Sequence, residues 1–371
     1  MKLVVLRNKL LEALSVVDRA IGENSNLPIL KCVYIRTDDN KIVFTTTNLE
    51  LAITYISSGK IIENGEVAIP LHLFSTIIKN ITSERITLES KGKKLFIETD
   101  NYEAFVQTQE IKEFPIIPSI HNKTQSLQIN SKTLVETIES VIVATQYSEI
   151  RPEISGVFVG VEEYGMVCAG TDSFRLAEKR VDAGFIKSTF VEPVKCIIPL
   201  KTSEEILKIL HNQEEGEVFV FIDPTQILFK TQSTEIISRL IDGNFPDYQP
   251  IIPKQTHTEA IIPRQEFLNA IRLTSSFSGR GNDITLTVGE NKKYIELFSS
   301  DNALGENRCK VPIHLKGERF TLVFNWKYLS DGFKIFKSDE LIIGVTTSDR
   351  PVIIKNQTDP SLIYVAMPIK N

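Results

Sequence analysis

The chain has 371 residues, of which 42 % are hydrophobic and 24 % are charged. These values are typical of folded globular proteins, so they exclude a disordered chain and a low-complexity fibre. The net charge of −5 argues against a protein that binds nucleic acid over its whole surface. At about one domain per 150 residues, the length predicts two or three domains.

The cysteines and the N-terminus bear on the compartment. Cys32, Cys168, Cys196 and Cys309 stand singly, without metal-ligand spacing, and we interpret them as small core residues in a reducing compartment. The apolar run at the N-terminus ends at Leu6, which is too short for a signal peptide. No segment has the roughly 18 uncharged apolar residues of a membrane helix. These features predict a cytoplasmic protein.

Four features recur three times in the same order along the chain. The first is the start of an amphipathic helix, whose apolar residues lie four apart on one face. It begins at Arg7, Ser131 and Arg264. The second is an alternating strand that ends in a small polar pair. It covers residues 43–48, 166–172 and 295–301.

The third feature is a strand that runs into a helix at a residue suited to a helix start. These residues are Pro70, Pro199 and Asn325, and helical spacing then covers residues 71–81, 200–211 and 326–336. The fourth is a proline that follows Phe or Met, at Pro115, Pro246 and Pro368.

Corresponding features lie 122 to 133 residues apart. We therefore predict three copies of one domain, at residues 1–118, 119–251 and 252–371. Each copy is predicted to contain, in order, a strand, a helix, several strands, a second helix and a final set of strands. Two helices against many strands predict an α+β fold in which the helices pack on antiparallel sheets, because helices and strands do not alternate.

No catalytic constellation stands out. The chain has no nucleophile elbow, P-loop, zinc-protease motif or dinucleotide fingerprint, and its five histidines stand apart. Asp172 is the best acidic candidate, and we favour a turn carboxylate that caps local amides over a catalytic acid. The prediction is a protein without catalysis, metal or cofactor.

Five segments carry a resemblance to a known family: residues 27–30, 151–156, 171–177, 240–248 and 364–370. With them the chain resembles the bacterial DNA polymerase III beta subunits, or beta sliding clamps, along essentially its whole length. The resemblance implies a head-to-tail dimeric ring with pseudo-sixfold symmetry, in which helices line the hole and sheets form the outer wall. Such a ring encircles double-stranded DNA without sequence preference.

The resemblance also implies the function and the partners. A clamp does not catalyse; it tethers the replicative polymerase to DNA and so confers processivity in chromosomal replication. Its partners are a second copy, DNA, the polymerase, a clamp loader and other proteins with a clamp-binding peptide.

Helices that face phosphates should be more basic than the rest of the chain. The six predicted helical segments carry +5, which leaves −10 for the remainder of a chain whose total is −5. This segregation agrees with a ring that holds DNA inside. The candidate DNA-facing residues are Arg7, Lys9, Arg19, Lys79, Lys201, Lys208, Arg264, Arg272, Lys327 and Lys334.

In the family, client proteins insert a linear peptide into a hydrophobic pocket between the second and third domains. Transferred by motif, its lining is Ile154, Thr171, Ser173, Phe174, Arg175, Leu176, Pro246, Val365, Met367, Pro368 and Ile369. Aliphatic and Met walls suit an apolar anchor, and Arg175 is expected to hold a backbone carbonyl or an acidic group. For the ring interface, where edge strands pair around an apolar contact, the candidates are Phe105 and Leu273.

The chain departs from the family at three places. Ser173-Phe174 replaces a common Gly-His, which predicts a more apolar pocket. Pro250 stands where a basic residue is common, which predicts the loss of one client contact. Asn24 or a neighbour also replaces a basic residue, which predicts a weaker DNA contact. Two alternatives stay open at this point: a nucleic-acid-processing enzyme on a repeat scaffold, and a β-rich scaffold that does not bind DNA.

Overall fold

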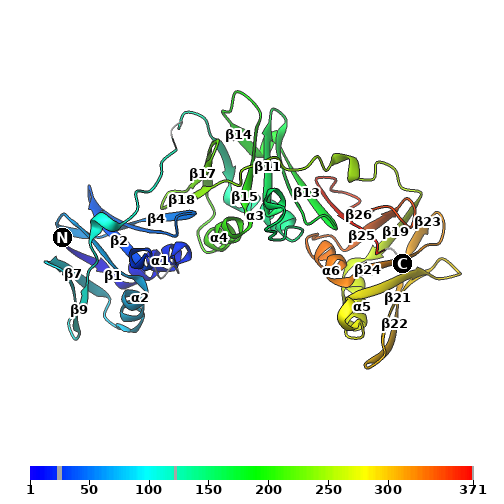
Figure 1. Cartoon of the computed structure of the whole chain (residues 1–371), viewed down its shortest axis with the longest axis horizontal. Helices are drawn as coiled ribbons and strands as arrows, with labels where there is room; N and C mark the ends of the chain where they lie inside the picture. The colour runs from blue at the N-terminus through cyan, green and yellow to red at the C-terminus, as the bar shows by residue number, and fades with distance from the viewer. Residues whose placement is uncertain (23–26, 121–122, 370–371) are drawn as a thin grey trace. The chain divides into compact units, whose positions relative to one another are not determined.

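The computed structural model describes residues 1–22, 27–120 and 123–369. Each predicted repeat has one element order: a strand, a helix, five strands, a helix and three strands (Figure 1). The first repeat contains β1 (Lys2–Leu6), α1 (Arg7–Val17), β2 (Cys32–Asp38), β3 (Lys41–Thr47), β4 (Leu51–Ser58), β5 (Lys60–Glu63), β6 (Glu66–Pro70), α2 (Leu71–Asn80), β7 (Arg85–Lys91), β8 (Lys94–Glu98) and β9 (Glu103–Gln107).

The second repeat contains β10 (Leu127–Asn130), α3 (Ser131–Ile142), β11 (Gly156–Glu162), β12 (Gly165–Thr171), β13 (Arg175–Asp182), β14 (Ile186–Ser188), β15 (Val194–Pro199), α4 (Leu200–His211), β16 (Glu217–Asp223), β17 (Gln226–Lys230) and β18 (Thr234–Arg239). The third contains β19 (Thr258–Pro263), α5 (Arg264–Ser275), β20 (Asp283–Val288), β21 (Tyr294–Asp301), β22 (Gly305–Pro312), β23 (His314–Lys316), β24 (Thr321–Asn325), α6 (Trp326–Lys334), β25 (Glu340–Val345), β26 (Val352–Lys355) and β27 (Leu362–Ala366). Single 3₁₀ turns are η1 (Asp18–Ala20), η2 (Pro28–Lys31), η3 (Ile111–Glu113), η4 (Pro152–Ile154), η5 (Ala183–Phe185), η6 (Gln249–Ile251) and η7 (Gly279–Gly281).

The described strands form four antiparallel sheets. Their orders are β5-β1-β7-β8-β9, β14-β10-β16-β17-β18-β4-β3-β2-β6, β15-β11-β12-β13-β27-β26-β25-β19-β23 and β22-β21-β20-β24. Each nine-stranded sheet joins two repeats, one through the pair β18–β4 and the other through the pair β13–β27. The predicted α+β fold with helices on antiparallel sheets is confirmed.

The chain divides into two compact units. Unit 1 contains Met1–Ser131, Lys187–Val191 and Lys208–Leu240, and unit 2 contains Lys132–Ile186, Glu192–Leu207 and Ile241–Asn371. The division passes through the central repeat because each nine-stranded sheet takes part of it. The two domain boundaries, at 118 and 251, remain an interpretation of the repeat.

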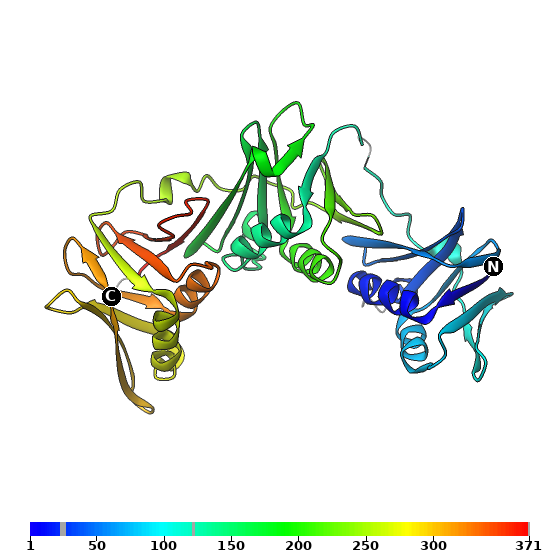
Figure 2. The same cartoon turned by 180° about the vertical axis from the view of Figure 1, so that it is seen from behind.

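The predicted helical faces are buried. In unit 1, α1 and α2 pack together on one side of the strands and bury apolar residues such as Leu14 and Phe74 (Figures 1 and 2). In unit 2, α5 and α6 pack through Phe267 and Phe333, whose ring centres are 4.4 Å apart. Asn325 caps α6, since its side chain accepts a 3.0 Å hydrogen bond from the amide of Lys327.

Smaller features follow the sequence as well. Three cysteines are buried as predicted, while Cys309 is only half-buried. The predicted hairpin at Asp38-Asp39 is present, with Asp39 and Asn40 at φ values of 40° and 67°, as a type I′ turn requires. Among the described residues, no helix is long and apolar enough to cross a membrane.

Candidate functional site

The turn between β12 and β13 is held by two side chains. The Asp172 carboxylate accepts hydrogen bonds from the amides of Phe174 at 2.9 Å and Arg175 at 3.0 Å. Thr171 closes the turn by donating its hydroxyl to the Arg175 carbonyl at 2.7 Å. Asp172 is thus the local cap that the sequence predicted. The turn places Ser173 in the left-handed region, with φ of 78°, and leaves Phe174 60 % exposed.

Arg175 lies at the centre of a charged network. Its Nε is 3.0 Å from the Asp172 carboxylate, and its terminal nitrogen is 2.6 Å from the carboxylate of Asp331 on α6. The guanidinium also lies over the ring of Tyr328, 4.6 Å from its centre. Only 11 % of the Arg175 side chain is exposed, so the two carboxylates offset the cost of burying its charge.

This network differs from the expected role of Arg175. We expected a guanidinium available to a client's carbonyl or acidic group. The structure instead directs it to two carboxylates of the same chain, and its role is to fix the turn against α6. Burial raises the pKa of the neighbouring Tyr364 phenol, whose hydroxyl donates to the Tyr328 carbonyl at 2.8 Å.

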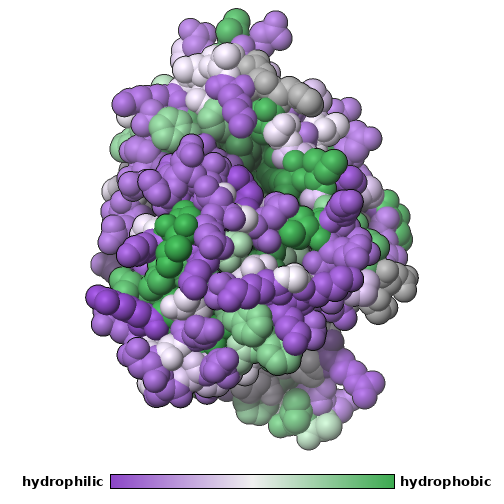
Figure 3. All heavy atoms as spheres, turned by 90° about the vertical axis from the view of Figure 1, so that its left-hand side faces the viewer, coloured by the Kyte–Doolittle hydropathy of each residue, from purple (hydrophilic) through white to green (hydrophobic). Residues whose placement is uncertain are grey.

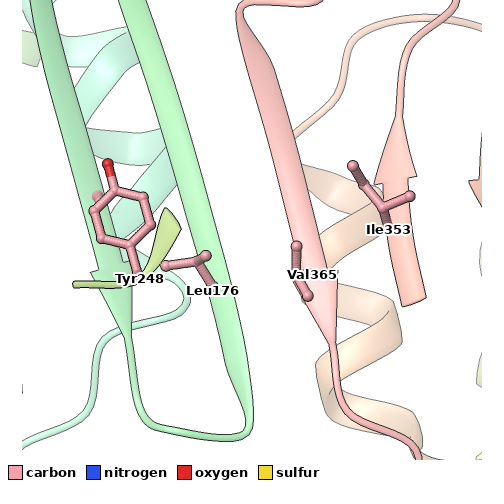
Figure 4. Packing of buried hydrophobic residues seen from close by; sticks show 5 residues of the cluster. Leu176, Tyr248, Ile353 and Val365 are labelled. Atoms are coloured by element: carbon pink, nitrogen blue, oxygen red, sulfur yellow. The ribbon is translucent and has the colours of Figure 1, made fainter. Parts of the chain in front are cut away.

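An apolar cluster lies beside the turn. Leu176 and Val365 face each other across the β13–β27 pair, and both are buried with Tyr248 and Ile353 (Figure 4). Phe245, which precedes Pro246, packs against this cluster. The cluster supplies the aliphatic and aromatic surface that an apolar peptide side chain needs.

The C-terminal strand is tied to the same turn. The amide of Met367 donates to the carbonyl of Phe174 at 2.9 Å, and the amide of Ile369 donates to Val323 at 2.7 Å. Arg151 links η4, which contains Ile154, to the turn by donating to the Ser173 hydroxyl at 2.8 Å. The predicted pocket residues from β12, β13 and β27 are therefore brought together, while Pro368 and Ile154 are buried side chains next to this region.

Sequence reasoning missed three members of the site: Tyr328, Asp331 and Arg151. Tyr328 stacks on Phe174 with ring centres 6.5 Å apart. Tyr328 and Asp331 are three residues apart on α6, a spacing that puts both on one helical face. That spacing was the available signal, although nothing in the sequence indicated the turn that this face contacts.

Arg7 and Arg264, two of the predicted DNA-facing residues, bind backbone carbonyls of a neighbouring helix. The Arg7 guanidinium donates to the carbonyls of Ile78 and Lys79 at 3.2 and 2.7 Å. Arg264 repeats this arrangement with the carbonyls of Phe333 and Lys334 at 2.9 and 3.4 Å. Each arginine starts the first helix of its repeat and binds the end of the second, where helix carbonyls lack partners. Helix packing therefore accounts for both.

The other predicted basic residues lie on helices or directly after one. Lys79, Lys201, Lys208, Arg272, Lys327 and Lys334 are exposed, and Lys9 and Arg19 are half-buried. Lys9 is 3.1 Å from Glu12, and Lys334 is 3.9 Å from Asp331. Exposed pairs of this kind hold a side chain weakly and leave it available to a phosphate.

Apolar side chains are exposed at the two ends of the repeat array. Phe105 on β9 is 52 % exposed, with the Lys94 ammonium 4.1 Å from its ring centre, and Leu273 on α5 is 59 % exposed. Figure 3 faces the first repeat and shows hydrophobic patches within a mostly hydrophilic surface. Pro250 is exposed in η6, and Asn24 lies outside the described residues.

Three family models together cover nearly the whole chain. They describe the N-terminal domain of the DNA polymerase III beta subunit at residues 1–118, its central domain at 128–247 and its C-terminal domain at 249–370. This chain belongs to the DNA polymerase III beta subunit family.

Individual relatives agree with the family. The curated "Beta sliding clamp" of Bacillus subtilis (strain 168) is 27 % identical over 381 residues and covers 100 % of both chains. That of Chlamydia pneumoniae is 26 % identical over 374 residues, covering 100 % of this chain and 99 % of the relative. The crystal structure of the DNA polymerase sliding clamp from Bacillus subtilis matches with a TM-score of 0.93 and 27 % identity, over 100 % of this chain and 99 % of that one.

Membership of this family establishes the class of protein to which the chain belongs. The chain is a DNA sliding clamp, the non-catalytic processivity subunit of DNA polymerase III in DNA replication. The alternatives of a processing enzyme and of a scaffold without DNA are not favoured.

Proposed function

We propose that two copies of this chain close head to tail into a ring around double-stranded DNA. The observation that carries the proposal is the pairing of equivalent strands. Inside the chain, β4 pairs with β18 and β13 pairs with β27, and each pair joins one repeat to the next. In the third repeat, β22 is the equivalent of β4 and β13. In the first repeat, β9 is the equivalent of β18 and β27. Both β22 and β9 are edge strands of their sheets. A second copy supplies the missing partner for both.

Burial at the internal junctions supports this closure. Strand register makes Phe105 equivalent to Ile237 and Val365, both buried at their junctions. Helix position makes Leu273 equivalent to Val16 and Ser140, which are buried as well. Phe105 and Leu273 therefore have the exposure of interface residues whose partner is a second copy.

The solution mass tests this closure. At micromolar concentration we expect about 84 kDa, twice the chain mass of 41.9 kDa. Phe105→Asp and Leu273→Asp should each shift the mass toward 41.9 kDa, because each buries a carboxylate at the interface. Phe185→Asp, at an exposed site of the central repeat, is the matched control and should stay dimeric. A wild-type monomer at this concentration would contradict ring closure.

We infer that the turn between β12 and β13 and the end of β27 form the site for client peptides. Leu176, Val365 and Met367 supply its aliphatic wall, and Phe174 stacked on Tyr328 supplies an aromatic one. The polymerase, the clamp loader and other clients are the proposed partners, and the proposed compartment is the cytoplasm. Because Arg175 is bound by two carboxylates, apolar contact carries recognition here more than charge does.

Phe174 gives the direct test of the peptide site. Phe174→Ala should weaken binding of an apolar clamp-binding peptide about tenfold, because it removes an exposed aromatic wall without opening the core. Tyr164→Ala, at another exposed aromatic residue, should leave the affinity unchanged. Fluorescence anisotropy with a labelled peptide measures both. Equal affinities for wild type and Phe174→Ala would exclude this wall from the site.

We also infer that DNA lies along the basic helices. The half-buried Lys9 on α1, the exposed lysines on α2, α4 and α6, and Arg272 on α5 give these helices their positive charge. Loose contacts of this kind allow sliding, and they are weakened by salt. Arg7 and Arg264 contribute positive charge while their guanidinium groups stay bound to helix ends.

A further inference from the structure

The two junctions between repeats have the same backbone frame in both nine-stranded sheets. Across the first, Tyr34, Thr45, Thr54 and Glu235 lie opposite one another on β2, β3, β4 and β18. Across the second, the same places on β11, β12, β13 and β27 are held by Phe158, Ala169, Glu178 and Ile363. Residues at the two junctions can therefore be compared one for one.

The linkers that cross the junctions start in the same way. Phe114 lies 5.1 Å from Tyr34, and Phe245 lies 5.1 Å from Phe158, measured between ring centres. Three residues further along, the second linker carries Tyr248 and the first carries Ile117. Ile117 and Tyr248 are thus equivalent positions, each packed against the apolar cluster of its junction.

At the second junction, Tyr248 fills the space between linker and sheet. It is buried, its ring lies 6.4 Å from Phe158, and its hydroxyl donates to Glu178 at 2.7 Å. At the first junction two of these groups are smaller, since Ile117 replaces the tyrosine and Thr54 replaces the glutamate. A cavity of about 410 Å³ that is open to solvent lies there. It is lined by Tyr34, Arg36, Thr45, Thr54 and Glu235 from the strands and by Ile111, Phe114, Pro115, Ile116 and Ile117 from the linker.

The cavity has an aromatic side and a polar side. The rings of Tyr34 and Phe114 form the first. The second contains the Thr45 and Thr54 hydroxyls, 3.2 Å apart, and the Glu235 carboxylate, which is 2.6 Å from Lys230. Its volume is within the range of small-molecule pockets. Tyr34 donates its own hydroxyl to Glu66, so that phenol is already bound.

We propose that this cavity is a binding site for a para-substituted phenol, such as a tyrosine side chain presented by another molecule. The ring would lie against Tyr34, Phe114 and Ile117, and the hydroxyl would reach Thr54 or Glu235, as Tyr248 reaches Glu178 at the second junction. The protein's own tyrosine in the equivalent space thus identifies the chemistry of the ligand. This site belongs to unit 1 and is separate from the peptide site at the second junction.

The test uses the full chain, p-cresol as the probe and isoleucine-methyl NMR spectra. We expect p-cresol to shift the methyl signals of Ile117 and Ile111, and toluene to bind at least about tenfold more weakly because it lacks the hydroxyl. N-acetyl-tyrosinamide distinguishes the sources of the phenol: its binding identifies a peptide tyrosine, and its exclusion identifies a free phenol. Equal binding of p-cresol and toluene, or no shift at Ile117, would overturn the proposal.

Two variants complete the test. Ile117→Tyr should fill the cavity from within, raise the melting temperature and reduce p-cresol affinity at least about tenfold. Ile150→Tyr, at a side chain that is 91 % exposed and does not line the cavity, should change neither. Thr54→Val leaves the fold and the linker unaltered. It should lower the affinity for p-cresol and leave the affinity for toluene unchanged. Unchanged p-cresol affinity in Ile117→Tyr would show that the ligand binds elsewhere.

Discussion

Arg175 shows how one side chain can hold a site together without contacting a ligand. It bridges Asp172 on its own turn and Asp331 on α6 while its ring contact with Tyr328 keeps the guanidinium out of water. The turn that positions Phe174 and Leu176 therefore depends on a charge network that is largely buried. Removing the cation would leave Asp172 with its amide donors but no cation, and Asp331 with only the more distant Lys334 at 3.9 Å.

Arg175→Ala should accordingly lower the free energy of unfolding by about 3 kcal/mol, because it breaks a buried ion pair and leaves its partners uncompensated. Arg151→Ala is the matched control. Arg151 is more exposed and pairs with Glu153 at 3.1 Å, so its loss should cost about 0.5 kcal/mol. Urea unfolding measures both. Equal losses for the two variants would contradict the buried network.

Part of this site was predictable at the residue scale. Thr171 ends one strand and Asp172 follows it, and their short polar side chains predict the turn that the structure shows. Asp331 is 156 residues away from Arg175 along the chain. Its position depends on how α6 packs against the turn, and no local pattern encodes that packing.

At the scale of elements, the junction register predicts how β9 meets β22 of a second copy. Thr54 faces Glu235, and Glu178 faces Ile363, at the two internal junctions. The equivalent pair across the ring interface is Glu103 with the partner's Arg308. Opposite charges on facing strands stabilise the pair, and like charges destabilise it.

Charge reversal tests this register. Glu103→Arg and Arg308→Glu should each raise the dimer dissociation constant about tenfold, because each places like charges opposite one another in both interfaces. The double variant restores the opposite signs and should recover most of the affinity. Sedimentation velocity over a dilution series measures all three. A double variant weaker than both single variants would exclude the register.

The helices show what element-scale patterns predict and what they miss. Apolar residues four apart predicted all six helices, because a helix buries one face. The positive charge of these helices assigned Arg7 and Arg264 to DNA. Their bonds to the ends of α2 and α6 join elements more than 60 residues apart, so the contact arises from tertiary packing rather than from helical spacing.

At the scale of the whole molecule, charge and repeat number fit one function. The helical segments carry +5 within a chain of −5, and three like repeats end in two unpaired edge strands. A second copy pairs with both edge strands and closes the ring, so that retention on DNA depends on the ring rather than on tight contacts. The sequence predicts the threefold period. It does not predict that strands of two repeats pair in one nine-stranded sheet, which follows from the strand register of the structure.

The most direct measurement is retention on DNA before and after the DNA is cut. The protein is placed on a nicked circular plasmid by its clamp loader with ATP, separated from free protein by gel filtration at high salt, and the plasmid is then cut once. A closed sliding ring stays with the circle and leaves after the cut. Protein that stays bound to the cut plasmid, or that never remains on the circle, would contradict the account.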